Sequence, residues 1–69
     1  MNTFESTLTN LRCISRQAER DGVDRSKRAA GLTRRLAKLR TFERKTEPFR
    51  QNWLDQCEAY ETHIAELSA

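Results

Sequence analysis

The spacing of the apolar residues constrains this chain more than any other feature. In three stretches they recur every three or four positions, which is the period of one face of an α-helix. Only three residues are Val or Ile, whereas ten are Arg and seven are Ala, a balance that disfavours β-strands. The sequence therefore predicts an all-α fold.

The first predicted helix covers about residues 3–20. Its apolar stripe consists of Phe4, Leu8, Leu11, Ile14 and Ala18. Asn2 is placed to cap its N-terminus, with Glu5 three residues later as in a capping box. Gly22 marks its end, because glycine adopts the left-handed conformation after a helix without steric cost.

The second predicted helix covers about residues 25–45 and begins after Asp24, a typical N-cap. Its apolar stripe consists of Ala29, Leu32, Leu36 and Leu39, with Phe42 on one flank. Arg44 and Lys45 suit a helix C-terminus, where cations are favourable. Gly31 inside the helix costs about 1 kcal/mol relative to Ala, and therefore indicates a close approach to another helix.

The third predicted helix covers about residues 47–68. Thr46 supplies a capping hydroxyl before it, and Pro48 suits its first turn because no N–H partner is needed there. Its apolar stripe consists of Phe49, Trp53, Cys57, Tyr60, Ile64 and Leu67.

Two helical architectures fit these stretches within one domain, residues 1–69. Three separate helices would form a small bundle. Alternatively, the second and third stretches form one long helix kinked at Pro48, because the apolar spacing continues through the break. In that hairpin the apolar stripe from Phe49 to Leu67 would be exposed to solvent, and a second chain would be needed to cover it. Since a chain of 69 residues also gains stability by oligomerising, we expect a homodimer.

Charge is strongly segregated along the chain. Residues 25–50 contain ten Lys or Arg and two Glu, whereas residues 51–69 contain four acids and no Lys or Arg. The basic residues either bind the phosphates of a nucleic acid or pair with Asp55, Glu58 and Glu61 of the third helix. No aromatic residue is interleaved with them, so stacking on single-stranded bases is not predicted. The candidate nucleic-acid contacts are Lys27, Arg28, Arg34, Arg35 and Lys38.

Residues 17–26 resemble the helix-turn-helix DNA-binding motif, with an Ala, a turn Gly and an apolar residue in the expected order. The positions that must be apolar for the two helices to pack are instead Asp21, Arg28 and Gly31. The stretch therefore predicts an ordinary helix end followed by a turn.

The chain has few side chains of the kinds that serve in catalysis or metal binding. His63 is the only histidine, at the edge of an apolar stripe, and we expect it to be packed. Cys57 falls on the apolar stripe and Cys13 on a polar face, and with His63 they do not make a zinc site. We predict no enzymatic activity, metal or cofactor. The absence of a long apolar run and of a secretory signal pattern predicts no contact with the membrane and a cytoplasmic location with reduced thiols.

The short arginine-rich chain, with helices and no catalytic motif, resembles the small accessory proteins of temperate bacteriophages, particularly early-region products of lambdoid phages. The resemblance implies a helical dimer in the cytoplasm of a bacterial host, acting on a host or phage protein. It rests on no diagnostic motif and assigns no site residue.

Together these features predict a non-enzymatic, homodimeric helical regulator that acts by protein–protein binding. The alternatives are a nucleic-acid-binding regulator that uses the basic second helix, and a small export-type chaperone whose groove accepts an amphipathic helix. The residues expected to mediate self-association or partner binding are Phe49, Trp53, Tyr60, Ile64 and Leu67.

Overall fold

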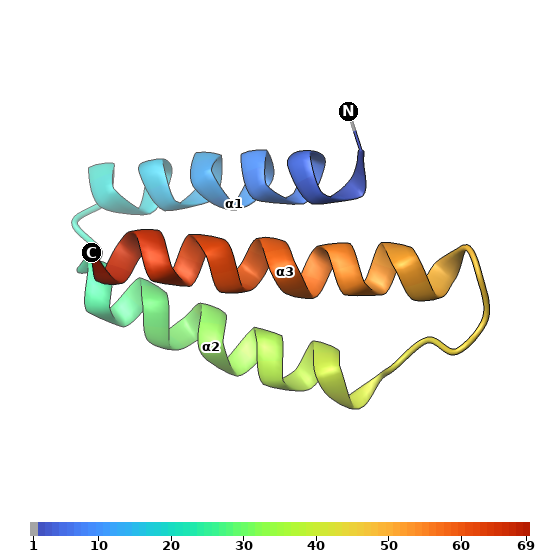
Figure 1. Ribbon diagram of the computed structural model, residues 1–69. Coiled ribbons are helices and arrows are strands. Elements are labelled where there is room, and N and C mark those ends of the chain that lie inside the picture. The colour runs from blue at the N-terminus through green and yellow to red at the C-terminus, as the bar shows by residue number, and fades with distance from the viewer. Residues whose placement is uncertain (1) are drawn as a thin grey trace.

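The computed structural model describes residues 2–69 and contains three α-helices: α1 (Thr3–Arg20), α2 (Arg25–Thr41) and α3 (Phe49–Ser68). The helices lie side by side in a flattened layer with extents of 40 × 25 × 19 Å. As Figure 1 shows, α3 lies in the middle, α1 runs in the same direction as α3, and α2 runs in the opposite direction. The all-α prediction is confirmed. The long kinked helix is wrong, because a linker at residues 42–48 reverses the chain between α2 and α3.

Both ends of α1 form as predicted. The side chain of Asn2 accepts a hydrogen bond from the backbone N–H of Glu5 at 2.8 Å. At the other end Gly22 has φ +83°, and the N–H groups of Gly22 and Val23 donate to the carbonyls of Glu19 and Ala18 at 3.0 and 2.9 Å. This pair of bonds is a Schellman motif, which stops the helix and turns the chain. Since α1 and α2 also contact each other little, the ordinary helix end predicted in place of a helix-turn-helix is confirmed.

Helix α2 begins as predicted and ends early. Asp24 caps its start by accepting from the N–H of Ser26 at 3.0 Å. The predicted end at Lys45 is wrong, because the N–H of Phe42 turns back to the carbonyl of Leu39 at 3.2 Å and closes the helix at Thr41. Arg44 and Lys45 consequently lie in the linker, where they cannot act on a helix C-terminus.

Helix α3 begins at Phe49, two residues later than predicted. Its N-cap is Pro48, which follows a cis peptide bond and has no capping side chain, so the predicted Thr46 hydroxyl cap is wrong. The carboxylate of Glu47 supplies an acceptor instead, to the N–H of Gln51 at 3.3 Å.

The core forms on both sides of α3. Its buried side chains are Leu8, Leu11, Leu32, Leu36, Cys57, Ala59 and His63. Because α3 packs against both other helices, it buries Ala59 and His63 in addition to part of the predicted stripe. Helix α1 packs almost only on α3, so its buried face is narrow and Ile14, predicted to be apolar core, is half exposed.

Gly31 does not mark a close helix contact. A Cβ built at this position meets no atom within 4 Å, so the prediction of a close approach is wrong. Among the described residues, no helix is long and apolar enough to cross a membrane.

Candidate functional site

Two adjoining hollows lie where the end of α2, the linker and the beginning of α3 meet. One has a volume of about 420 Å³ and the other about 320 Å³, and they share Leu39, Phe42 and Gln56. We call this region the aromatic–basic surface. It is lined by Arg35, Lys38, Leu39, Phe42, Arg44, Phe49, Asn52, Trp53, Gln56 and Tyr60.

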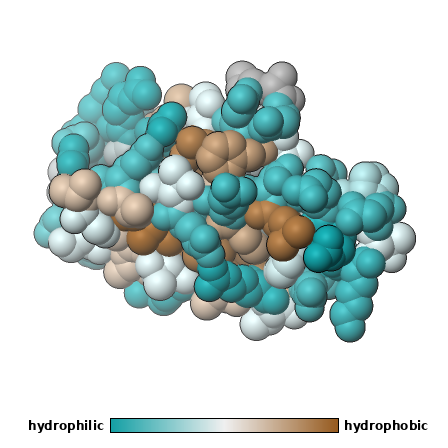
Figure 2. Space-filling view, viewed as in Figure 1, coloured by the Kyte–Doolittle hydropathy of each residue, from teal (hydrophilic) through white to brown (hydrophobic). Residues whose placement is uncertain are grey.

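The early end of α2 creates the apolar part of this surface. Phe42 leaves the helix and is 63% exposed, and Phe49 at the start of α3 is 61% exposed. Trp53 lines the same hollow and is held by a hydrogen bond from its Nε1–H to the carbonyl of Leu39 at 2.9 Å. Exposed rings on an otherwise hydrophilic surface mark a site of interaction more often than a scattered single residue does. Figure 2 shows one face of the molecule, on which hydrophobic side chains gather near the middle among hydrophilic ones.

The charges of the aromatic–basic surface all have one sign. Arg35, Lys38 and Arg44 line the hollows, and no Asp or Glu lines either of them. None of these three cations forms an ion pair within residues 2–69. The surface therefore combines an apolar floor with a cationic rim.

The predicted interaction residues divide between different parts of the bundle. Phe49, Trp53 and Tyr60 line the aromatic–basic surface. Ile64 is half-buried and lines neither hollow, and Leu67 lies beside a cavity at the opposite end. The sequence did not predict the role of Phe42, because the extension of α2 to residue 45 placed it on the flank of a helix.

Most basic residues of α2 have no acidic partner within the described chain. Lys27, Arg34, Arg35 and Lys38 are exposed and form no ion pair among the described residues. Of the acids predicted to neutralise them, Glu61 alone does so, and its partner is Arg40. Asp55 and Glu58 form no ion pair within the described chain, and the side chain of Asp55 accepts from the Gln51 amide at 2.9 Å.

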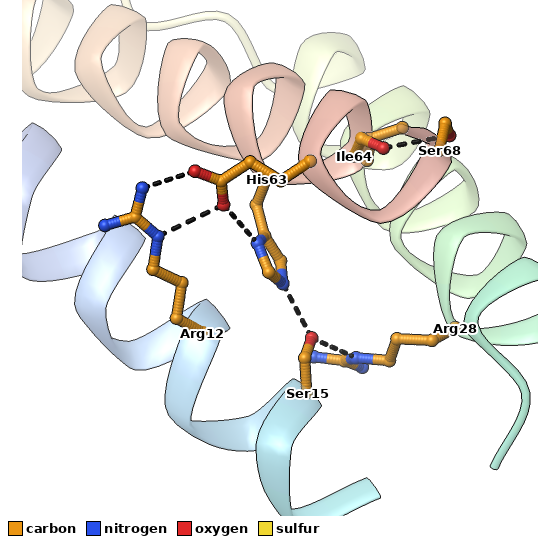
Figure 3. A network of polar contacts seen from close by, with 7 residues as sticks. Arg12, Ser15, Arg28, His63, Ile64 and Ser68 are labelled. Carbon is orange, nitrogen blue, oxygen red and sulfur yellow. Dashed lines mark hydrogen bonds and ion pairs between the residues drawn. The ribbon is translucent and has the colours of Figure 1, made fainter. Parts of the chain in front are cut away.

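Arg28 differs from the other predicted nucleic-acid contacts. It is half-buried, and its Nε–H donates to the hydroxyl oxygen of Ser15 at 3.1 Å (Figure 3). It therefore faces α1. Burial and the neighbouring charge of Arg35 lower the pKa of its guanidinium below the ordinary value.

A chain of hydrogen bonds continues from this contact across all three helices (Figure 3). The hydroxyl of Ser15 lies 2.7 Å from Nε2 of His63, and Nδ1 of His63 lies 2.9 Å from Glu66. Glu66 also accepts from Arg12, whose Nε is 3.1 Å away. Because the Glu66 carboxylate is only an acceptor, Nδ1–H of His63 donates to it.

These contacts determine the pKa of Glu66. Hydrogen bonds from Arg12 and His63 lower the pKa of the Glu66 carboxyl to about 2, and the same contact raises the pKa of Arg12. Sequence reasoning predicted a packed His63, which is confirmed, and missed Ser15 and Glu66. The spacing of His63 and Glu66, three residues apart on one helix face, was the available signal.

The order serine–histidine–carboxylate is also that of hydrolase triads. In this chain the same hydrogen bonds also join α1 to α3, and the bond from Arg28 adds α2. We call Arg12, Ser15, Arg28, His63 and Glu66 the polar network.

The two thiols differ in environment, as predicted. Cys13 is exposed, whereas Cys57 is buried, and burial raises the pKa of the Cys57 thiol. Within residues 2–69, no three His, Cys, Asp or Glu side chains gather in a way that would hold a metal ion.

Comparison with known proteins gave no match to a family model, to a curated protein or to a solved structure. The resemblance to phage accessory proteins therefore stays a prediction. The function of the chain has to be inferred from the geometry and charge of the aromatic–basic surface and of the polar network.

Proposed function

We propose that this protein is a non-enzymatic interaction protein that binds an acidic, amphipathic helical segment of another protein through the aromatic–basic surface. The observation that supports it most is that two exposed phenylalanines and three cations, but no acid, line the two hollows. Glu43 is the acid of an adjoining hollow, which shares Arg44 and Phe49 with this surface. An amphipathic helix inserts apolar residues into such a groove while its polar flanks meet the rim. Acidic flanks complement Arg35, Lys38 and Arg44.

Phe42 and Phe49 are the proposed anchors of this interface. Burial of a large apolar side chain contributes about 2 kcal/mol, and aromatic residues dominate the binding energy of many interfaces. Trp53, fixed by its bond to Leu39, lines the same hollow and is preorganised for contact with the partner. The two hollows are small, so we expect an affinity typical of transient complexes.

A second copy of the chain is a poorer occupant of this surface than an acidic partner. In a two-fold dimer the same patch meets itself, so Arg35, Lys38 and Arg44 of both chains would face one another. Like charges across an interface oppose association. The homodimer predicted from the sequence stays a prediction, and its main argument, a bare third helix, no longer applies because α3 lies between α1 and α2.

Trp53, the only tryptophan, gives a direct test because it lies in the groove. The probe is a synthetic amphipathic peptide with Leu or Phe on one face and Glu on the other, and the comparison peptide carries Lys in place of Glu. Titration of the acidic peptide should shift the tryptophan emission with saturation, whereas the Lys peptide should not. Equal binding of both peptides, or of neither, would contradict the proposal.

Matched variants show which residues bind the acidic peptide. Phe42→Ala and Phe49→Ala remove exposed rings and should each weaken the acidic peptide by about tenfold or more. Ile14→Ala removes an exposed apolar side chain from α1 and should leave the affinity unchanged. For charge, Lys38→Gln should weaken binding more than Lys27→Gln, because only Lys38 lines the groove.

A nucleic-acid-binding regulator is the second candidate, and the unpaired cations of α2 favour it. Lys27, Arg34, Arg35 and Lys38 have no acidic partner within the described residues. Binding to a DNA or RNA duplex through these residues would fall steeply with salt, by roughly the −0.9 power of concentration per contact. If duplexes bind at 150 mM salt and Arg34→Ala weakens them while Phe49→Ala does not, this second function takes the place of the first.

A further inference from the structure

A separate cavity of about 290 Å³ lies at the opposite end of the bundle, beside the polar network. Its walls come from the second half of α1, the first turn of α2 and the end of α3. The residues that line it are Arg12, Ser15, Arg16, Ala18, Glu19, Val23, Arg25, Arg28, His63, Glu66 and Leu67. Four arginines and two glutamates thus meet around one small space.

Arg28 is the residue of this cavity that has a buried hydrogen-bond donor to offer to a ligand. Its Nε–H is already bonded to Ser15, and this bond fixes the plane of the guanidinium group. Its Nη2 is buried and has no hydrogen-bond partner in the described residues. A buried donor without an acceptor is costly, and charged donors more so, which favours an acceptor supplied from outside.

The surrounding charges define the kind of acceptor. Arg12 and Glu66 neutralise each other, which leaves Arg16, Arg25 and Arg28 against Glu19. Arg16 and Arg25 are exposed, and neither forms an ion pair within residues 2–69. Guanidinium groups reach the cavity from α1 and from α2, so a group with oxygens in several directions can accept from both helices.

We propose that this cavity binds the phosphate group of a small molecule, with Arg28 as the central ligand and Arg16 and Arg25 as flanking ligands. A tetrahedral phosphate presents more acceptors than a planar carboxylate, and its charge matches the excess of arginine. The volume suits a small ligand, since it lies at the lower end of the range for ligand pockets, about 300 Å³. This inference does not rest on the proposed protein partner, because the two sites lie at opposite ends of the helices.

The test is an NMR titration of the ¹⁵N-labelled chain with inorganic phosphate, phenyl phosphate and acetate at constant ionic strength. We expect saturable shifts of the Arg28 Nε–H and of the backbone amides at the start of α2. Tighter binding of phenyl phosphate than of inorganic phosphate would identify an organic phosphate as the ligand, and equal binding would identify free phosphate. Acetate should bind more weakly than either, and acetate that binds as tightly as phosphate would overturn the choice of phosphate.

Two variants of α2 with the same change of charge distinguish a specific phosphate site from general attraction of phosphate by the positive charge of the chain. Arg25→Gln should weaken phosphate by about tenfold, whereas Arg34→Gln, exposed on α2 and outside the cavity, should change it less than about twofold. Arg28→Gln should weaken phosphate further, and Arg25→Gln keeps the test valid if Arg28→Gln disturbs the fold. The absence of saturation, or equal losses in Arg25→Gln and Arg34→Gln, would overturn the proposal.

Discussion

The two ends of this bundle use their side chains in opposite ways. At the end where α1 turns into α2, a histidine, a serine, a glutamate and two arginines form hydrogen bonds that join all three helices. At the other end a linker joins α2 to α3, and two phenylalanines remain more than half exposed. Hydrogen bonds join the helices at the first end, where Nη2 of Arg28 is the buried side-chain donor left without a partner among the described residues, whereas apolar groups are left uncovered at the second.

This difference separates stability from binding. Substitutions in a buried hydrogen-bond network leave unpaired partners behind and destabilise the fold. Substitutions of exposed rings cost little stability, because the rings bury little area in the isolated chain. The turn end is therefore expected to hold the bundle together, and the linker end is expected to supply the surface that binds a protein partner.

The largest expected effect is that of His63→Ala. It removes a buried side chain and one hydrogen-bond partner each from Ser15 and Glu66, so the free energy of unfolding should fall by about 3 kcal/mol. Phe49→Ala, at the linker end, should lower it by less than about 1 kcal/mol. Urea unfolding followed by circular dichroism measures both. If His63→Ala leaves too little folded protein, Ser15→Ala should still lower the midpoint by more than Phe49→Ala does, and the reverse order would contradict the comparison.

Trp53→Phe should have the next largest effect. The smaller phenyl ring keeps an aromatic group at this position, but it has no N–H to donate to the carbonyl of Leu39, where α2 ends. Loss of one such hydrogen bond lowers the free energy of unfolding by about 1 kcal/mol. The same urea measurement tests it, and a variant as stable as the wild type would show that this bond does not stabilise the linker end.

Gly31→Ala should have a smaller effect, of opposite sign. Alanine favours a helix by up to about 1 kcal/mol over glycine, and nothing lies within 4 Å of the added Cβ. The melting temperature should therefore rise. A lower melting temperature would mean that α2 packs more closely against a neighbour at this position than the single chain shows.

The sequence predicted the individual helices better than the way in which they pack. Local signals set the ends of α1, because Asn2 and Gly22 act within one turn of their own positions. The apolar stripes identified Leu8, Leu11, Leu32 and Leu36 correctly. The burial of Ala59 was missed because a central helix has two buried faces, and periodicity detects one stripe most easily.

The candidate sites depend on contacts between distant residues, which a single sequence does not reveal. Ser15 and His63 are 48 positions apart, and no local pattern joins them. The aromatic–basic surface was only partly predicted, because the end of α2 at Thr41 decides that Phe42 is exposed. The helix ends at a local hydrogen bond, from the N–H of Phe42 to the carbonyl of Leu39, although the apolar repeat continues beyond it.

The smallest expected effect on stability is the pH dependence due to Glu66. Its pKa in the folded chain, about 2, is lower than the ordinary value of 4.5, so its contacts stabilise the fold above about pH 4.5 and are lost as the pH falls towards 2. Melting temperatures of the wild type and of Glu66→Gln should therefore converge as the pH falls through this range. The difference should be modest because the carboxylate is partly exposed, and a difference that stays constant to pH 2 would contradict the assignment.

The division of the bundle into an end that stabilises the fold and an end that binds a protein partner is tested most directly by mapping where the acidic amphipathic peptide binds, from the ¹⁵N–¹H spectrum of the labelled chain. We predict that the shifts concentrate at residues 35–44 and 49–60, including the indole N–H of Trp53, and that residues of the polar network hardly change. Shifts centred on Ser15, Arg28 and His63, or spread evenly along α2, would contradict this division.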